Sequence, residues 1–268
     1  MKIGKATVPR TAICTSDEHT IVIRGRDLSK ELIGKISFVE HFYLLLTGRM
    51  ASAGEAAVLN ATLVAIAEHG LVPSVQAARM TFAAAPDAMQ GAVAAGILGC
   101  GSVVLGSSET AGRMYSEIDA KVRDGAAVDA AALEVMQGWR AAGRSIPGYG
   151  HPQHKERDER VGALFGVARD AGTDLRFVAI AEAAEAIIPR VLGKGLKLNV
   201  SGAIPAVLLG AGFPVQALKG VPILARTAGL IAHLFEEIGQ PIGFALSYQA
   251  TREMVYEGEL PPGFGAHP

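Results

Sequence analysis

The chain has 268 residues, of which 50% are hydrophobic and 19% charged, a composition typical of a folded protein with a sizeable core and not of a disordered one. Lys and Arg number 25 and Asp and Glu number 26, and no basic stripe with interleaved aromatic residues is present, so nucleic acid is not an expected partner. Cys14 and Cys100 are the only cysteines. Their separation argues against a disulfide scaffold or a zinc site and favours a reducing compartment.

The first ten residues, MKIGKATVPR, lack the apolar core of a signal peptide, so the sequence predicts a cytoplasmic protein. The stretch 88–106 is apolar enough to be considered as a membrane span. It has no flanking charged anchors, and Ala92 and Gly96 place small side chains four residues apart on one helical face. We therefore interpret this stretch as a buried interface helix, and no membrane association is expected.

The β-branched segment 19–25 predicts a strand or hairpin arm, and a mainly helical body follows it. Ser37 with Glu40 and Ser52 with Glu55 have capping-box spacing, which predicts the starts of two helices. The expected helices in chain order are one ending at Gly48, one ending at residues 68–70, and then 73–85, 88–106, 110–123, 129–142, 177–192, 201–209 and 225–239. The chain becomes more polar after Gly106, which indicates a second lobe.

The loop 143–160 combines a Pro-Gly-Tyr-Gly bend with a concentration of cations. A guanidinium matches a carboxylate and a lysine suits a phosphate, so this mixture indicates a site for a ligand that carries both groups. A solvated charged turn at the start of a helix, neutralised by Asp158 and Glu159, is the alternative interpretation. No third ligand accompanies the two histidines, so a metal site is not expected. The cations are His151, His154, Lys155, Arg157 and Arg160.

Two further residues have an ordinary structural interpretation beside a functional one. His69 stands at a predicted helix C-terminus before Gly70, where the helix dipole alone accounts for an imidazolium. Arg226 begins an otherwise apolar stretch, so its side chain either reaches solvent or points into a cleft. The sequence pattern leaves both alternatives open.

Five segments in chain order resemble the citrate synthase superfamily, and most closely its citryl-CoA lyases and the lyase module of ATP-citrate lyase. They are IRGRDLSKELIGKISFVEHFYLLLTGR, AEHGLVPSVQAARMTFAAAPDAMQGAVAAGILGCG, PGYGH, LNVSG and LARTAGLIAH. The resemblance implies an all-α, two-lobe fold around a cleft, with a short N-terminal β arm. It implies a large helical domain at 1–106 and 216–268 and a small one at 107–215. It also implies a homodimer.

The resemblance assigns roles to individual residues. His69 matches the histidine that binds the oxaloacetate moiety, and His151 matches the one that acts on its carbonyl or the corresponding hydroxyl. Carboxylate-binding positions match Arg160 and Arg226, with Arg252 in a looser match to the arginine donated across the dimer. The implied catalytic residues are His151, His69 and Ser201; the substrate-binding residues are His69, Arg160, Arg226, Asn199 and Arg252; the CoA-binding residues are Lys155, Arg157, Gly106, Ser107 and Ser108.

Two departures from the family pattern bear on the reaction. Val104 stands where condensing synthases have the histidine that stabilises the acetyl-CoA enol, and Ser201 stands where the family has its catalytic aspartate. Citrate formation needs both an enol-stabilising donor and a base. We therefore predict cleavage of (3S)-citryl-CoA to acetyl-CoA and oxaloacetate, with no cofactor beyond the coenzyme A thioester itself. The alternatives are a lyase for another branched hydroxyacyl-CoA, a condensing enzyme, and a non-catalytic protein that binds CoA and a dicarboxylate.

Overall fold

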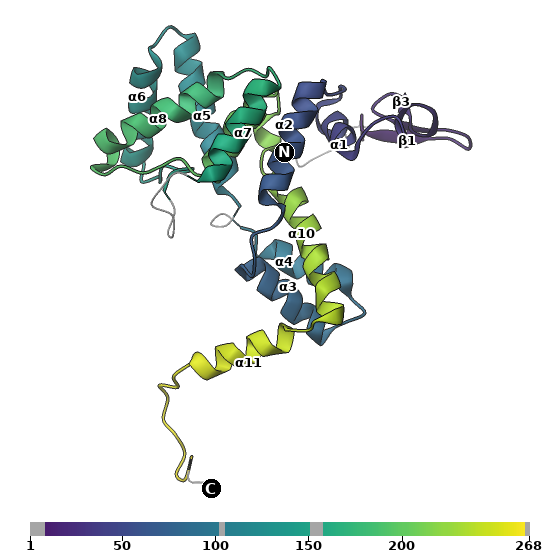
Figure 1. The fold of residues 1–268 in the computed structure, drawn as a ribbon, viewed down its shortest axis with the longest axis vertical. Coiled ribbons are helices and arrows are strands. Elements are labelled where there is room, and N and C mark those ends of the chain that lie inside the picture. Colours follow the sequence, from purple (N-terminus) through teal and green to yellow (C-terminus); the bar gives the residue numbers. More distant parts are fainter. Residues whose placement is uncertain (1–8, 102–104, 151–157, 266–268) are drawn as a thin grey trace. The chain divides into compact units, whose positions relative to one another are not determined.

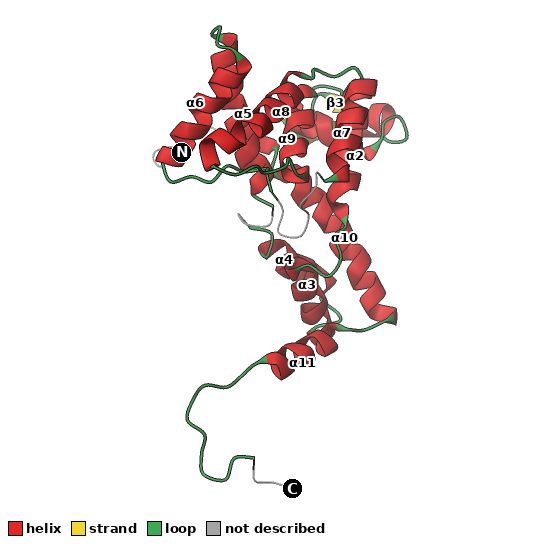
Figure 2. Cartoon of the chain, turned by 60° about the vertical axis from the view of Figure 1, so that its left-hand side comes forward, coloured by secondary structure: helices red, strands yellow, loops and turns green. Residues whose placement is uncertain are grey.

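The structure is a computed structural model that describes residues 9–101, 105–150 and 158–265. Helices dominate the described chain, and strands occur in it only near the N-terminus (Figures 1 and 2). This agrees with the expected all-α class and short β arm. The helices are α1 (Phe38–Thr47), α2 (Ala53–Ala67), α3 (Pro73–Ala84), α4 (Met89–Leu98), α5 (Ser107–Arg123), α6 (Val128–Ala141), α7 (Glu159–Asp170), α8 (Arg176–Leu192), α9 (Val200–Gly210), α10 (Gly220–Gly239) and α11 (Gly243–Glu253), with a π-helical turn at Leu28–Leu32 and a 3-10 turn at Val215–Ala217.

The N-terminal arm is an antiparallel sheet of β1 (Cys14–Ser16), β2 (Ile21–Ile23) and β3 (Arg26–Asp27) in that order. Arg24 and Gly25 connect β2 to β3 with φ angles of 48° and 81°. Two consecutive positive φ angles give a two-residue turn whose twist suits a hairpin. Arg24 also donates from Nε and Nη2 to the carbonyl of Leu45, at 2.9 and 2.6 Å, and so ties the arm to α1.

Local sequence signals set the ends of the first helices. Ser37 and Glu40 form a complete capping box at the start of α1, and Ser52 and Glu55 form one at the start of α2. Gly48 ends α1 in the left-handed conformation, with φ of 77°. These predicted boundaries are confirmed.

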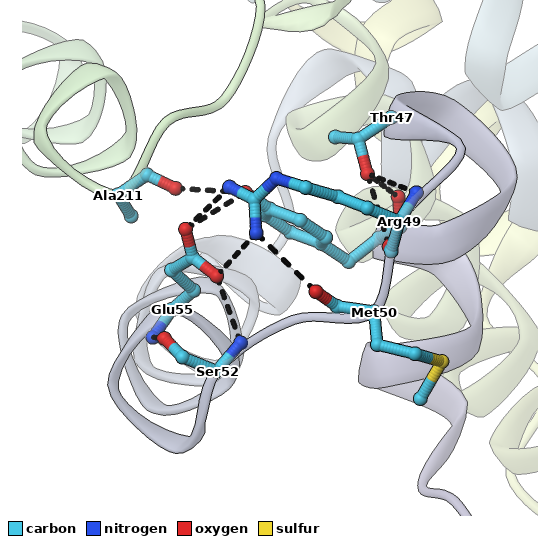
Figure 3. Close-up of polar contacts among 7 residues, drawn as sticks. Thr47, Arg49, Met50, Ser52, Glu55 and Ala211 are labelled. Atoms are coloured by element: carbon cyan, nitrogen blue, oxygen red, sulfur yellow. Dashed lines mark hydrogen bonds and ion pairs between the residues drawn. The ribbon is translucent and has the colours of Figure 1, made fainter.

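A polar cluster joins α1 and α2 to the end of α9 (Figure 3). The buried Tyr43 hydroxyl lies 3.0 Å from the carbonyl of Ala211, to which it donates, and 3.1 Å from Glu55 Oε1. Arg49 donates to both carboxylate oxygens of Glu55 and to the Tyr43 oxygen. The cluster therefore fixes the C-terminal end of α9 against the first two helices.

The chain forms two compact units, residues 1–68 with 100–226 and residues 69–99 with 227–268. The core of the first unit centres on α9, whose residues Gly202 to Leu208 are all buried and which packs against α2, α5, α7 and α8. In the second unit, a smaller core joins Val75 and Phe82 of α3 to Leu230 and Leu234 of α10. These units divide the chain differently from the predicted lobes, and the predicted cleft between lobes stays a prediction.

The expected long helix at 88–106 is wrong in length, because α4 ends at Leu98 with Gly99 as its C-cap. Its small-residue face is covered within its own unit. A Cβ on Gly96 would lie 2.8 Å from Leu230 Cδ1 and 2.8 Å from the carbonyl oxygen of Ser74. Gly96 thus permits close packing of α4 on α3 and α10, and this face is not available for contact with another chain.

One helical stretch of the described chain, Val215–Gly239, passes a length and hydropathy test for a membrane span. It contains the buried Arg226 and Glu237 as well as the buried Leu230 and Leu234, as a core helix does. Length and apolar composition therefore carry no argument for a membrane here. At ten residues, α4 is too short to span a bilayer.

Candidate functional site

Asn199 and Ser201 stand at the N-terminus of α9, and Arg160 is connected to it through Asp158. Asn199 is the N-cap of the helix, and its Oδ1 accepts from the amides of Ser201 and Gly202 at 2.9 and 3.3 Å. Its Nδ2 donates to the carbonyl of Gly150 at 2.6 Å. Both ends of the Asn199 amide are therefore bound to backbone, and Ser201 is held one residue inside the helix start.

The Pro-Gly-Tyr-Gly bend packs directly on this helix start. Tyr149 forms an antiparallel bridge with Leu198, and Gly150 donates to the carbonyl of Lys197 at 2.7 Å. Gly148 has φ of 86°, and a Cβ there would lie 2.7 Å from the Cα of Gly202. Glycine is required at this position both for the conformation and for the close approach of the two backbones.

Tyr149 of the bend and Tyr115 of α5 are both buried and lie within hydrogen-bond distance of each other. The Tyr149 hydroxyl lies 3.0 Å from the Tyr115 hydroxyl and donates to the carbonyl of Ala181 on α8 at 2.9 Å. Burial raises the pKa of Tyr115 well above its usual range. Tyr115 is therefore a neutral hydrogen-bonding support and not an acid–base group at neutral pH.

Asp158 and Arg160 approach the same helix start from α7. Arg160 donates from Nε to Asp158 Oδ1 at 3.0 Å and from Nη2 to Oδ2 at 2.8 Å, and Oδ2 also accepts from the amide of Val200 at 3.3 Å. Burial acts to raise the pKa of Asp158, but the hydrogen bonds and charge of Arg160 outweigh it and lower the pKa. Asp158 is thus an ionised, paired carboxylate at the N-terminus of α9.

Arg226 is 5% exposed, and its Nε and Nη1 have no hydrogen-bond partner among the described residues. Of the two open alternatives, the side chain is buried and does not reach solvent. A buried guanidinium without a partner is costly, so a carboxylate ligand is its natural counter-ion. Arg226 belongs to the same unit as the N-terminus of α9.

The start of α5 carries the predicted CoA-binding residues that the structure describes. Gly106 is its N-cap, Ser107 is the first helical residue and Ser108 is buried. No side chain caps this helix start in the described chain. Helix N-termini offer backbone amides to anions, so the location suits a developing enolate or a phosphate.

The other predicted residues lie elsewhere or outside the described chain. His69 and Arg252 belong to the second compact unit, where both are exposed. α2 ends at Ala67, so His69 follows the helix end and is not in its last turn. The residues outside the described ranges are Val104, His151, His154, Lys155 and Arg157.

A cavity of about 450 Å³ lies beside the bend, between α8 and the segment that leads to α9. Its charged lining residues are Glu182, Glu185 and Lys197, and Lys197 lies 3.6 Å from Glu185. Because two carboxylates accompany one lysine, this cavity is poorly suited to phosphate.

Sequence reasoning treated Asp158 only as a neutralising charge. Its contact with Val200 joins residues 42 positions apart, and no local pattern reveals such a contact. The available signal was the Asp-x-Arg spacing before a helix, which predicts an aspartate that caps the following amide and pairs with the arginine.

Comparisons with known proteins identify the family of the chain. The family described as "Citrate synthase, C-terminal domain" matches residues 37–242. Citrate/2-methylcitrate synthase of Bacillus subtilis is 28% identical over 210 residues, which are 75% of this chain and 53% of that protein. The chain spans about half the length of the curated relatives it matches.

Among solved structures, citryl-CoA lyase from Hydrogenobacter thermophilus matches with a TM-score of 0.83 and 33% identity, over 95% of this chain and 96% of that one. ATP citrate lyase of Methanosaeta concilii, solved with (3S)-citryl-CoA, matches with a TM-score of 0.77 over 98% of this chain and 44% of that one. Its identity of 22% supports a shared fold alone.

Proposed function

The chain belongs to the citrate synthase family, and we propose that it is a citryl-CoA lyase, which cleaves (3S)-citryl-CoA to acetyl-CoA and oxaloacetate. The match to the lyase of Hydrogenobacter thermophilus carries this proposal, because it covers almost the whole of both chains. The synthases among its relatives match over 53% and 52% of their own length, at 28% and 24% identity. The lyase of Hydrogenobacter thermophilus is 33% identical, a higher identity than either synthase has, and this favours the lyase reaction over condensation.

Cleavage begins when a base removes the proton of the tertiary hydroxyl. The bond between the hydroxyl-bearing carbon and the thioester's α-carbon then breaks, which leaves oxaloacetate and the enolate of acetyl-CoA. A proton delivered to that carbon completes the second product. We propose His151 as the base. Gly150, which precedes it in the sequence, accepts a hydrogen bond from Asn199 through its carbonyl.

At the N-terminus of α9, Ser201 stands where the family has the aspartate that serves citrate synthesis. Condensation needs a base for a weakly acidic methyl group, and the hydroxyl of Ser201 is not such a base at neutral pH. Asp158, whose carboxylate contacts the amide of Val200, is paired with Arg160, and its pKa is lowered. Ser201 can still position a proton-delivering water. The amides of Ser107 and Ser108 are the proposed donors to the enolate oxygen.

The arginines support a polycarboxylate as the acyl portion. Arg226 is buried with two nitrogens unpartnered in the described chain, and Arg160 lies beside the N-terminus of α9 with its side chain 30% exposed. His69 and Arg252 are proposed to complete the substrate site, and Lys155 and Arg157 to bind the CoA phosphates. No metal or redox cofactor takes part in the proposed reaction.

The test is incubation of the purified protein with citryl-CoA. We expect acetyl-CoA and oxaloacetate as products, a rate about 10²–10⁴-fold lower for His151→Ala, and no citrate from acetyl-CoA and oxaloacetate. His19→Ala, a change at an exposed histidine of the arm, is the matched control and is expected to retain the wild-type rate. A folded protein inert towards citryl-CoA contradicts the proposal.

Because Ser201 departs from the family pattern, two other functions also need to be tested. A panel of branched hydroxyacyl-CoA esters separates citryl-CoA from other acyl groups that a serine at this position would admit. Calorimetric binding of CoA and oxaloacetate without turnover would favour a non-catalytic binding protein. A cytoplasmic location stays a prediction.

We also propose that the chain forms a homodimer. Ile231, Phe235 and Ile238 form one stripe on α10 and are 48%, 75% and 63% exposed, respectively. Phe244 and Tyr248 of α11 are 69% and 65% exposed in the same unit. Exposed apolar groups at this density are typical of a surface that another chain covers.

A further inference from the structure

The guanidinium of Arg160 has five N–H groups, and three of them have described partners. Nε and Nη2 donate to the two oxygens of Asp158, and Nη1 donates to the carbonyl of Ala65, in the last turn of α2, at 3.3 Å. One N–H on each terminal nitrogen is left over in the described chain. The edge formed by the two terminal nitrogens of a guanidinium is one that a carboxylate binds in a bidentate contact.

Asp158 is itself fixed on three sides. Its side chain is 10% exposed, Oδ1 accepts from the amide of Arg160 at 3.1 Å, and Oδ2 accepts from the amide of Val200 at 3.3 Å. Because the carboxylate is anchored to the first residue of α9, the plane of the guanidinium it binds is set relative to α9. The contact with Ala65 sets the same plane relative to α2.

A second Asp-x-Arg sequence in this chain shows what the first one adds. Asp174 accepts from the amide of Arg176 at 2.8 Å, and Arg176 Nη2 lies 3.4 Å from its carboxylate, as in the Asp158 motif. Asp174 is 52% exposed, and Arg176 turns its Nε to Asp119 at 3.1 Å. Of these two aspartates, only Asp158 makes a side-chain hydrogen bond in the described chain to a helix other than the one it precedes, through the amide of Val200 in α9.

We propose that Asp158 is a positioning residue, which holds Arg160 so that its two remaining N–H groups face a carboxylate of the ligand. This inference rests on the proposed function, in which Arg160 binds a substrate carboxylate. Asp158 does not touch the substrate. It sets the orientation of the guanidinium and couples that orientation to the helix end that carries Ser201.

The test is calorimetric titration of wild type, Asp158→Asn and Asp174→Asn with oxaloacetate and, separately, with CoA. Asparagine keeps one oxygen for the amide of Val200 but cannot bind the guanidinium in bidentate fashion. We expect Asp158→Asn to weaken oxaloacetate binding about tenfold and to leave CoA binding within twofold, because one bidentate contact is lost. Asp174→Asn is the matched control and is expected to bind both ligands like wild type.

Unchanged oxaloacetate affinity in Asp158→Asn, or equal losses for both ligands, would overturn the inference. Wild type that binds no oxaloacetate and cleaves no citryl-CoA would overturn the proposed function as well. Circular dichroism checks that the variants fold. If Asp158→Asn does not fold, Asp158→Glu keeps the charge but shifts the carboxylate by one methylene. It is then expected to weaken oxaloacetate binding several-fold, and wild-type affinity would contradict the positioning role.

Discussion

Arg79 and Arg226 are both buried arginines, 2% and 5% exposed, but their surroundings differ. Arg79 donates to Glu236 and to Glu237, which is also buried, and to the carbonyl of Gln240 at 2.9 Å. Arg226 has two nitrogens without a partner in the described chain. Burial of an unpaired charge opposes folding, whereas removal of one partner from a buried pair leaves the other uncompensated.

The two arginines therefore predict opposite outcomes for the same substitution. Arg226→Met is expected to raise the free energy of unfolding by about 1 kcal/mol and to abolish oxaloacetate binding, because the buried charge is removed with its ligand contact. Arg79→Met is expected to lower it by about 3–5 kcal/mol, because Glu237 loses its partner. Urea denaturation measures both changes. A loss of stability in Arg226→Met as large as in Arg79→Met would contradict an unpaired Arg226.

For single residues, the sequence predicted which positions have a role better than it predicted which groups their side chains contact. Asn199 was predicted as a substrate-binding residue, and the structure engages both ends of its amide with backbone. The LNVSG pattern makes a helix cap foreseeable, but the bond to Gly150 joins residues 49 positions apart. Contact of Asn199 with substrate stays a prediction. Such contacts depend on which segments lie close together in the fold, and local sequence spacing does not show this.

Among the elements, α9 is held by a polar cluster as well as by its apolar packing. Hydrogen bonds from Arg49 are the main cause that lowers the pKa of Glu55 from 4.5 to about 2. Burial is the main cause that raises the pKa of Tyr43 to about 12. The ionised Glu55 and the neutral Tyr43 are thus the forms that hold the end of α9 (Figure 3).

This cluster predicts part of the acid dependence of stability. The pKa of Glu55 is lower in the folded than in the unfolded chain, so its contribution is fully present above about pH 4.5 and is lost as the pH falls towards 2. Melting temperatures from pH 2 to pH 6 test this for wild type and Glu55→Gln. The variant is expected to melt lower at pH 6 and to change less on acidification. Glu134→Gln is the control, at a 68% exposed glutamate paired with Lys121, and its melting temperatures should depend on pH as those of wild type do. The same pH dependence in Glu55→Gln would contradict the role of Glu55.

Local signals predicted the two helices that begin with capping boxes, α1 and α2, and missed α11. α11 has no side-chain cap from its neighbours in sequence, and Glu237 of α10 accepts from the amides of Ile242 and Gly243 at 2.9 and 2.7 Å. α7 starts within the charged loop, where the helical start was only the alternative interpretation. The predicted length of α4 failed because its apolar run continues past Gly99, where the helix stops.

At the scale of the whole chain, the superfamily resemblance predicted the fold class, and the matched family confirms it. The sequence did not reveal how the second unit is assembled from residues 69–99 and 227–268. Its core pairs Val75 with Leu230 and Leu234, more than 150 positions away. Apolar periodicity marks each helix as amphipathic but does not identify its partner.

The apolar stripe of α10 makes the proposed dimer testable. Leu230 and Leu234 face the core of the second unit, whereas Phe235 is 75% exposed, so a charge at Phe235 leaves that core intact. We expect light scattering to show a dimer for wild type and a monomer for Phe235→Glu, because a carboxylate buried in an interface without a partner is costly. Val64→Glu, at a 72% exposed residue of α2, is the matched control and should remain dimeric. If Phe235→Glu stays dimeric and Val64→Glu dissociates, the contact between copies lies in the first unit and the α10 stripe has a different partner.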